Sequence, residues 1–155
     1  EKQGLGNIAK IEWDPHTTGG VIALAATTSG QQLGAKFLIA FTQSGDTARR
    51  MSRLRPDIPL LAFTPDEKTA HWLTLCWGAS VIKTPNYGSN EEMVTAVNRQ
   101  LQEMELAEQN DVVIIVFGSP MGVVGKTNTM RVHRLKGLDW VEPVELPPYM
   151  REDAE

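Results

Sequence analysis

The chain has 155 residues, enough for one domain with a sizeable hydrophobic core and too few for two ordinary domains. Its 41% hydrophobic and 22% charged residues are typical of water-soluble globular domains, and no apolar run approaches the roughly 20 residues that cross a bilayer, so no membrane partner is expected. The net charge of −4 comes entirely from residues 136–155, with two basic and six acidic side chains, so residues 1–135 are neutral overall and no nucleic-acid partner is expected.

The residue types that carry chemistry exclude several kinds of site. The single cysteine, Cys76, cannot form an internal disulfide or a multi-cysteine zinc site, and its apolar neighbours predict a buried structural thiol in a protein of the reducing cytoplasm. His16, His71 and His133 are too far apart for a metal-ligand motif, so no metal site is expected. No nucleophile elbow or paired-carboxylate motif is present, so no catalytic residue is predicted.

Helices and buried strands are predicted to alternate along the chain. Residues 1–16 lack a sustained period and begin with Glu rather than Met, which suggests a lead-in segment within a longer polypeptide. The next elements in order are a helix over 18–33, a strand over 36–41, a helix with Ala48, Met51 and Leu54 spaced by three, and a strand over 60–63. The apolar runs at 36–41 and 60–63 are typical of strands buried on both faces.

Two capping patterns mark the following helices. Thr64-Pro65-Asp66-Glu67 predicts a helix that is capped by Thr64 and ends at Gly78, after Trp77. Ser89-Asn90-Glu91-Glu92 predicts another helix, with Met93, Val97, Leu101 and Met104 on one side. The other elements are a strand over 79–83, a strand over 111–117, a glycine-rich loop over 118–128, an alternating strand over 129–135 and an acidic, proline-containing tail over 136–155.

This alternation predicts an α/β fold of three layers, in which a mostly parallel sheet has helices on both faces. The final strand is expected to be antiparallel, because the short loop before it contains no helix to make a parallel crossover. Its alternating pattern indicates one exposed face or an edge position. One α/β domain is therefore expected over residues 17–135.

One candidate ligand site follows the strand at 36–41, because ligands of open α/β sheets bind beyond the carboxyl ends of strands. In Thr42–Thr47, the hydroxyls of Ser44 and Thr47, the small Gly45 and the first turn of the next helix are suited to an anion. Helix capping explains the same residues without any ligand.

A second candidate is the loop Gly118–Asn128, which contains Gly125-Lys126-Thr127 after a buried strand. It is not an ATP-binding P-loop. Pro120 stands where such a loop needs glycine, and the loop leads into a strand rather than a helix.

Several motifs resemble the C-terminal domain of pyruvate kinases. Residues 41–50 read F-T-Q-S-G-D-T-A-R-R and contain that family's T-x-S-G-x-[ST] loop, which Arg55-Pro56 follows as the family's turn. Asp111–Val116 and Thr127–Val132 are similar to its D-V-V-I-V and T-N-T-x-R-V ending. The ordered match covers about residues 17–135, and the first motif looks most like actinobacterial members.

The resemblance implies an allosteric effector-binding and oligomerisation domain. In the family, the loop matching Thr42–Thr47 binds a phosphate of the effector, and the loop matching Gly118–Asn128 closes over the sugar of the effector. The strand matching Thr127–Leu135 commonly meets its equivalent across a two-fold interface, so other pyruvate kinase domains and subunits are implied partners. The implied effector-binding residues are Thr42, Gln43, Ser44, Gly45, Asp46, Thr47, Gly122, Val123, Gly125, Lys126 and Thr127.

Catalysis is implied to lie elsewhere. The family's residues for phosphoenolpyruvate, ADP and the Mg²⁺ and K⁺ ions belong to a barrel domain that is absent from this chain. No cofactor and no enzymatic activity are therefore expected of this chain alone.

Two departures from the family bear on the effector. Asp46 stands where members activated by sugar bisphosphates often have Lys or Arg, and a carboxylate there would repel a phosphate unless it points away or accepts a sugar hydroxyl. The loop at Gly118 is also slightly longer. Both favour a monophosphate, such as a hexose 6-phosphate or AMP, over a bisphosphate. Two alternatives remain open: an assembly module without a working effector site, and a small stand-alone α/β enzyme.

Overall fold

The structure is a computed structural model that describes residues 16–144. Most of the predicted lead-in segment and the part of the predicted tail after residue 144 therefore lie outside the described residues. The elements are α1 (Thr18–Leu33), β1 (Phe37–Phe41), α2 (Asp46–Arg53), β2 (Leu60–Thr64), α3 (Glu67–Leu73), β3 (Ala79–Lys83), α4 (Asn90–Glu103), β4 (Val112–Phe117) and β5 (Thr129–Arg134).

The strands form one sheet in the order β3-β2-β1-β4-β5. At its centre, Ile39 of β1 pairs in parallel with Leu61 of β2 and with Ile115 of β4. β5 runs antiparallel to β4, with Met130 opposite Val116, and forms one edge of the sheet. The predicted mostly parallel sheet with an antiparallel final strand is confirmed.

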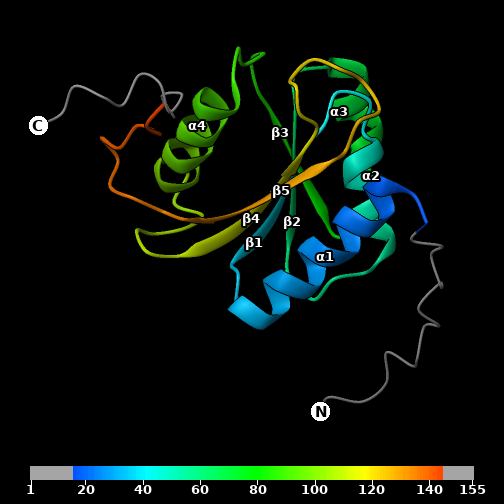
Figure 1. The fold of residues 1–155 in the computed structure, drawn as a ribbon, viewed down its shortest axis with the longest axis horizontal. Helices are drawn as coiled ribbons and strands as arrows, with labels where there is room; N and C mark the ends of the chain where they lie inside the picture. Colours follow the sequence, from blue (N-terminus) through cyan, green and yellow to red (C-terminus); the bar gives the residue numbers. More distant parts are fainter. Residues whose placement is uncertain (1–15, 145–155) are drawn as a thin grey trace, which may run out of the picture.

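Helices cover both faces of the sheet, as predicted, with α1, α2 and α3 on one face and α4 on the other (Figure 1). On the first face, small side chains such as Ala23 and Ala48 let α1 and α2 pack closely against Leu38. On the second face, Leu101 of α4 packs in the same cluster as Ile39. Successive side chains of a strand point to opposite faces, so β1 contributes to both clusters, as expected of a doubly buried strand.

α3 differs from its prediction at both ends. Asp66, rather than Thr64, is the N-cap, because its carboxylate accepts a 2.7 Å hydrogen bond from a backbone N–H of the first turn. Thr64 is instead the last residue of β2. The helix ends at Leu73 and does not reach Trp77. The Thr74 hydroxyl donates to a carbonyl of the last turn at 2.6 Å, and the chain continues in turns.

The structure differs from the predictions for Met104 and Cys76. Met104 lies just beyond α4 as its C-cap and is 50% exposed, whereas the other predicted apolar positions of α4 are buried. Cys76 lies in the turns after α3 and is only partly buried. That partial burial raises the pKa of its thiol, which favours the protonated form at neutral pH. The predicted N-cap of α4 is confirmed, because the Ser89 hydroxyl accepts a hydrogen bond from the backbone of the first turn at 3.1 Å.

The first part of the predicted tail, residues 136–144, packs along α4 and is called the strap below (Figure 1). Asn98 of α4 is fully buried and holds the beginning of the strap. Its side-chain oxygen accepts from the backbone N–H of Lys136 at 2.8 Å, and its side-chain nitrogen lies 3.4 Å from the Lys136 and Gly137 carbonyls. Further along, Glu142 pairs with Arg131 of β5 at 2.6 Å, so the strap joins α4 to β5.

His133 of β5 is buried beneath the strap. Its Nε2 atom lies 3.2 Å from the Asn98 side-chain oxygen, and its ring centroid lies 5.2 Å from that of Trp140. Burial, with a smaller contribution from Arg131, lowers the pKa of His133 to about 4, although Glu142 opposes the change. His133 is therefore a neutral imidazole at physiological pH, and its Nε2–H tautomer donates to Asn98.

Candidate functional site

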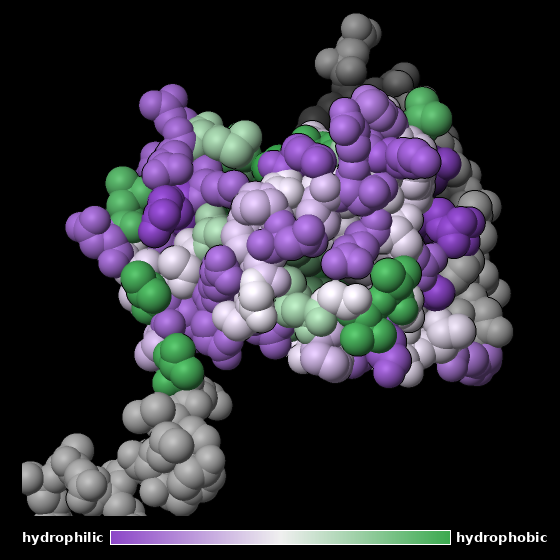
Figure 2. All heavy atoms as spheres, turned by 90° about the horizontal axis from the view of Figure 1, so that it is seen from above, coloured by the Kyte–Doolittle hydropathy of each residue, from purple (hydrophilic) through white to green (hydrophobic). Residues whose placement is uncertain are grey.

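A cavity lies where the chain reverses the order in which it adds strands. From β1 the chain proceeds to β2 and β3, and α4 then returns it to β4 on the other side of β1. The loops after β1 and β4 therefore diverge, and this is the position at which doubly wound sheets bind ligands. The cavity has a volume of about 340 Å³. Figure 2 looks onto the molecule from above the carboxyl ends of the parallel strands and shows a mostly hydrophilic surface with separate hydrophobic patches.

The two predicted segments meet around this cavity. Every predicted effector-binding residue except Gly45 lines it: Thr42, Gln43, Ser44, Asp46, Thr47, Gly122, Val123, Gly125, Lys126 and Thr127. The residues come from opposite sides of the switch point, one group after β1 and the other after β4.

The loop after β1 is held in shape by its own hydrogen bonds. The Thr42 hydroxyl accepts from the backbone N–H of Gly45 at 2.7 Å, and the Thr69 hydroxyl of α3 donates to the Gln43 carbonyl at 2.7 Å. Gly45 has a φ of +84°, and a side chain there would overlap the ring of Trp72. The absence of a side chain at Gly45 therefore accommodates Trp72, and the approach of a ligand to this backbone stays a prediction.

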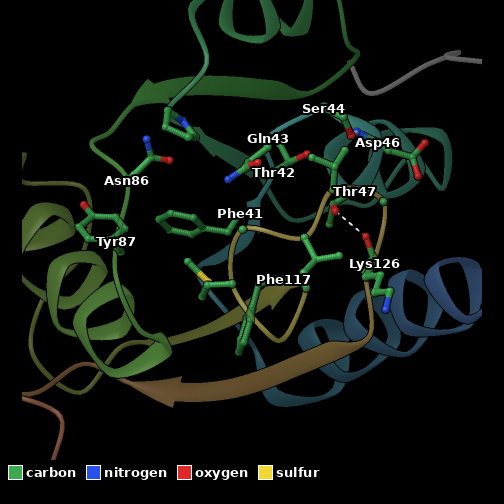
Figure 3. A pocket seen from close by; sticks show the side chains of 18 of the residues that line it. Phe41, Thr42, Gln43, Ser44, Asp46, Thr47, Asn86, Tyr87, Phe117 and Lys126 are labelled. Carbon is green, nitrogen blue, oxygen red and sulfur yellow. Dashed lines mark hydrogen bonds between the residues drawn. The ribbon is translucent and has the colours of Figure 1, made fainter.

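The loop after β4 is anchored to itself and to α2. The Asn128 side chain accepts from the backbone N–H of Ser119 at 2.8 Å and donates to its carbonyl at 2.6 Å, which closes the loop at its base. The hydroxyls of Thr47 and Thr127 form a buried 2.6 Å hydrogen bond, shown as a dashed line in Figure 3. This bond ties the two cavity-lining segments together.

Asp46 is paired with two cations. Its carboxylate accepts from Arg49 at 2.9 Å and from Arg50 at 2.7 Å, and both arginines lie one turn further along α2. Burial raises the pKa of Asp46, but the hydrogen bonds and charges of Arg50 and Arg49 outweigh it and leave that pKa below its ordinary value. The sequence predicted that this carboxylate would repel a phosphate unless it points away or accepts a sugar hydroxyl, and the structure pairs it with two positive charges.

One end of the cavity is aromatic and was missed by the sequence analysis. Phe41, Tyr87 and Phe117 line it, together with Met121 and Asn86 (Figure 3). The Phe41 and Tyr87 rings meet edge to face, with their centroids 5.6 Å apart. The strand-end rule applies equally to the loop after β3, which carries Asn86 and Tyr87, and it would have identified these residues.

Other site classes find no support in the part of the chain that the structure describes. Residues 16–144 contain no group of three or more His, Cys, Asp or Glu side chains that could hold a metal ion. Within the same residues, no helix has the length and apolar character of a membrane span.

The fold and this cavity define a doubly wound α/β domain with a small-molecule-sized crevice at its switch point. Residues 21–133 match the family model described as "Pyruvate kinase, alpha/beta domain". The chain therefore belongs to the pyruvate kinase family and corresponds to its C-terminal alpha/beta domain, as the sequence motifs predicted.

Individual relatives agree with this assignment. The chain is 44% identical over 121 residues to a pyruvate kinase of Mycobacterium tuberculosis, a match that covers 78% of this chain and 26% of that protein. It is 40% identical over 130 residues to a pyruvate kinase of Corynebacterium efficiens, covering 84% of this chain and 27% of that protein. The chain thus spans about a quarter of the length of these curated relatives, and the predicted likeness to actinobacterial members is confirmed.

Solved structures show the same fold. A Cryptosporidium parvum pyruvate kinase in complex with ADP superposes with a TM-score of 0.71 at 27% sequence identity, covering 80% of this chain and 25% of that one.

Proposed function

We propose that this chain is the allosteric effector-binding and oligomerisation domain of a pyruvate kinase. Phosphoryl transfer from phosphoenolpyruvate to ADP, with its Mg²⁺ and K⁺ ions, would then belong to a barrel domain outside this sequence, and the whole protein would act in the cytoplasm. The observation that carries the proposal is the convergence of both predicted loops on one cavity at the switch point.

The chemistry of the cavity supports a phosphorylated effector. The first backbone N–H groups of α2 have no partner within the helix, and the N-terminal end of a helix favours negative charge. The exposed Ser44 hydroxyl and the exposed Lys126 lie on the cavity wall beside them. At about 340 Å³, the cavity is at the small end of the range for ligand sites, which suits a hexose 6-phosphate or AMP.

Calorimetric titration of the 155-residue chain with AMP, glucose 6-phosphate and fructose 1,6-bisphosphate, in separate runs, tests this proposal. We expect saturable binding of a monophosphate and a loss of at least about tenfold in affinity for Lys126→Ala and Ser44→Ala, since charge-assisted hydrogen bonds contribute about 1.5–3 kcal/mol. The matched control is Lys36→Ala, which removes the same charge at the opposite end of the parallel strands, just before β1. There the Lys36 side chain makes a surface ion pair with Asp111. Absence of binding for all three ligands would contradict the proposal and favour the assembly-module alternative.

The oligomerisation part of the proposal concerns residues Thr127–Leu135. Among residues 16–144, β5 pairs with β4 alone, so it is an edge strand of the kind that can pair with a second copy, and Val132 on it is 48% exposed. Effector binding would regulate a tetramer only if the ligand had different affinities for two quaternary states. Sedimentation velocity is expected to show concentration-dependent dimers of the chain, which Val132→Glu abolishes. A monomer at all concentrations would refute a self-sufficient interface.

A further inference from the structure

Asp46 lies where three hollows of the surface meet. It lines the main cavity between the two loops, a second hollow that also involves Arg50, Lys126 and Gly19, and a third that involves Arg49. In Figure 3 its side chain points away from the aromatic end of the main cavity. Asp46 therefore lies on the boundary between the main cavity and each of the two hollows that contain an arginine.

The Asp46 carboxylate engages both arginines at once. Its two oxygen atoms accept separate hydrogen bonds, Oδ1 from Arg49 and Oδ2 from Arg50. Arg50 also donates to the Thr17 hydroxyl at 3.1 Å, so its guanidinium is fixed between α2 and the start of α1. The three side chains are 26%, 49% and 21% exposed for Asp46, Arg49 and Arg50 respectively, so a ligand has access to the cluster.

Arginines held in this way are weaker partners for a phosphate. The Asp46 carboxylate accepts one N–H from each guanidinium and offsets part of its positive charge, so it competes with a phosphate for the same donors. A ligand phosphate would have to displace Asp46, and the displaced carboxylate would remain beside it as a like charge.

We propose that Asp46 is a specificity-determining residue that acts as an internal anion: it occupies Arg49 and Arg50 and thereby restricts the effector site to ligands with one phosphate. This inference rests on the proposed effector-binding function and adds a mechanism for its selectivity. The first phosphate binds at the hydroxyls and backbone N–H groups of the loop Thr42–Thr47, on the main-cavity side of Asp46. A second phosphate finds its cationic partners already taken.

Occupation of the arginines by Asp46 and simple repulsion by its charge predict different changes in bisphosphate affinity. If Asp46 acted only by repelling anions, its neutralisation would strengthen bisphosphate binding whether or not Arg49 is present. If it acts by occupying the arginines, the gain depends on a free guanidinium, becomes smaller when Arg49 is also removed and disappears when Arg49 and Arg50 are both removed. A double-mutant cycle of Asp46 and Arg49 separates the two mechanisms.

The experiment uses fructose 6-phosphate and fructose 1,6-bisphosphate, which differ by one phosphate, in calorimetric titrations of the 155-residue chain. For Asp46→Asn we expect bisphosphate affinity to rise at least about tenfold relative to monophosphate affinity, as one or two charge-assisted contacts become available. In Asp46→Asn/Arg49→Gln the selectivity is expected to return part of the way to that of the unmodified chain, because Arg50 keeps its guanidinium, and in Asp46→Asn/Arg49→Gln/Arg50→Gln it is expected to return fully. Asp57→Asn is the matched control. It removes the same charge from the connection between α2 and β2, at the opposite end of the parallel strands, and it should leave the selectivity unchanged.

Three results would overturn the inference. One is a bisphosphate gain of equal size whether or not the arginines are present, which indicates simple repulsion. A second is an Asp46→Asn chain that binds monophosphate but shows no gain for the bisphosphate. The third is a tenfold loss of monophosphate affinity in Arg49→Gln alone, which would place Arg49 in direct contact with the effector and needs no Asp46 variant to be detected. Failure of the unmodified chain to bind any phosphorylated ligand would instead refute the proposed function itself, so the two failures are distinguishable.

Discussion

Replacing Gly45 with alanine is expected to lower the free energy of unfolding of this domain by about 2–5 kcal/mol. The left-handed backbone conformation costs a residue with a Cβ about 1–2 kcal/mol, and forcing a side chain into a packed site costs about 1–3 kcal/mol more. Both terms apply here, because φ is +84° and the new Cβ would overlap the Trp72 ring. Urea denaturation measures the change.

Gly122 provides the matched control for this experiment. Its φ of +83° is nearly the same, but a Cβ there would have no atom within 4 Å. Gly122→Ala should therefore show only the backbone term, about 1–2 kcal/mol. Equal costs at the two positions would show that Trp72 does not constrain Gly45. A loss of ligand binding in a Gly45 variant would report damage to the fold, which is why Lys126 and Ser44 are the better probes of the cavity.

Replacing Asn98 with alanine is expected to cost about 3 kcal/mol of unfolding free energy and to release the strap. Asn98 is fully buried, and its side chain bonds the strap at Lys136 and lies against His133. Its removal leaves buried polar groups without partners, each of which costs about 1–3 kcal/mol. Urea denaturation measures the loss, and faster tryptic cleavage after Lys136 reports the release of the strap.

Gln102 allows the contribution of burial to be separated from that of the strap contact. It donates to the same Lys136 carbonyl at 2.8 Å, but near solvent, so water can replace its hydrogen bond. Gln102→Ala should therefore cost less than about 1 kcal/mol. If Asn98→Ala costs no more than this, the buried amide is not what secures the strap.

The features of this protein that the sequence predicted are local or repetitive. The apolar runs of β1 and β2 are typical of strands buried on both faces, so doubly covered parallel strands could be predicted from hydrophobicity alone. The short helix-free loop before β5 required an antiparallel return. Thr42–Thr47 and Gly122–Thr127 could be placed at one edge of the sheet because the carboxyl ends of parallel strands lie together.

The errors at the helix ends had two causes, competition between two capping residues and the inability of periodicity to locate a last turn. Thr64 and Asp66 are both good N-caps, and strand pairing decided between them, because Thr64 is the last residue of β2, in register with Lys83 of β3. Met104 continued the helical period, yet α4 ends one residue before it, and periodicity does not locate the last turn.

The sequence by itself determined the class of fold, the family and the position of the candidate effector loops. Only the tertiary structure decided what Gly45 and Asn98 do, since Trp72 and the strap reach them from distant parts of the chain. It also decided the electrostatic character of Asp46. The spacing of Asp46, Arg49 and Arg50 permits ion pairs on any helix, but the start of α2 and the contact of Arg50 with Thr17 fix their geometry. Hydrophobic and turn patterns depend on residues that are close together in the sequence, whereas the role of a side chain depends on which distant groups the fold places against it.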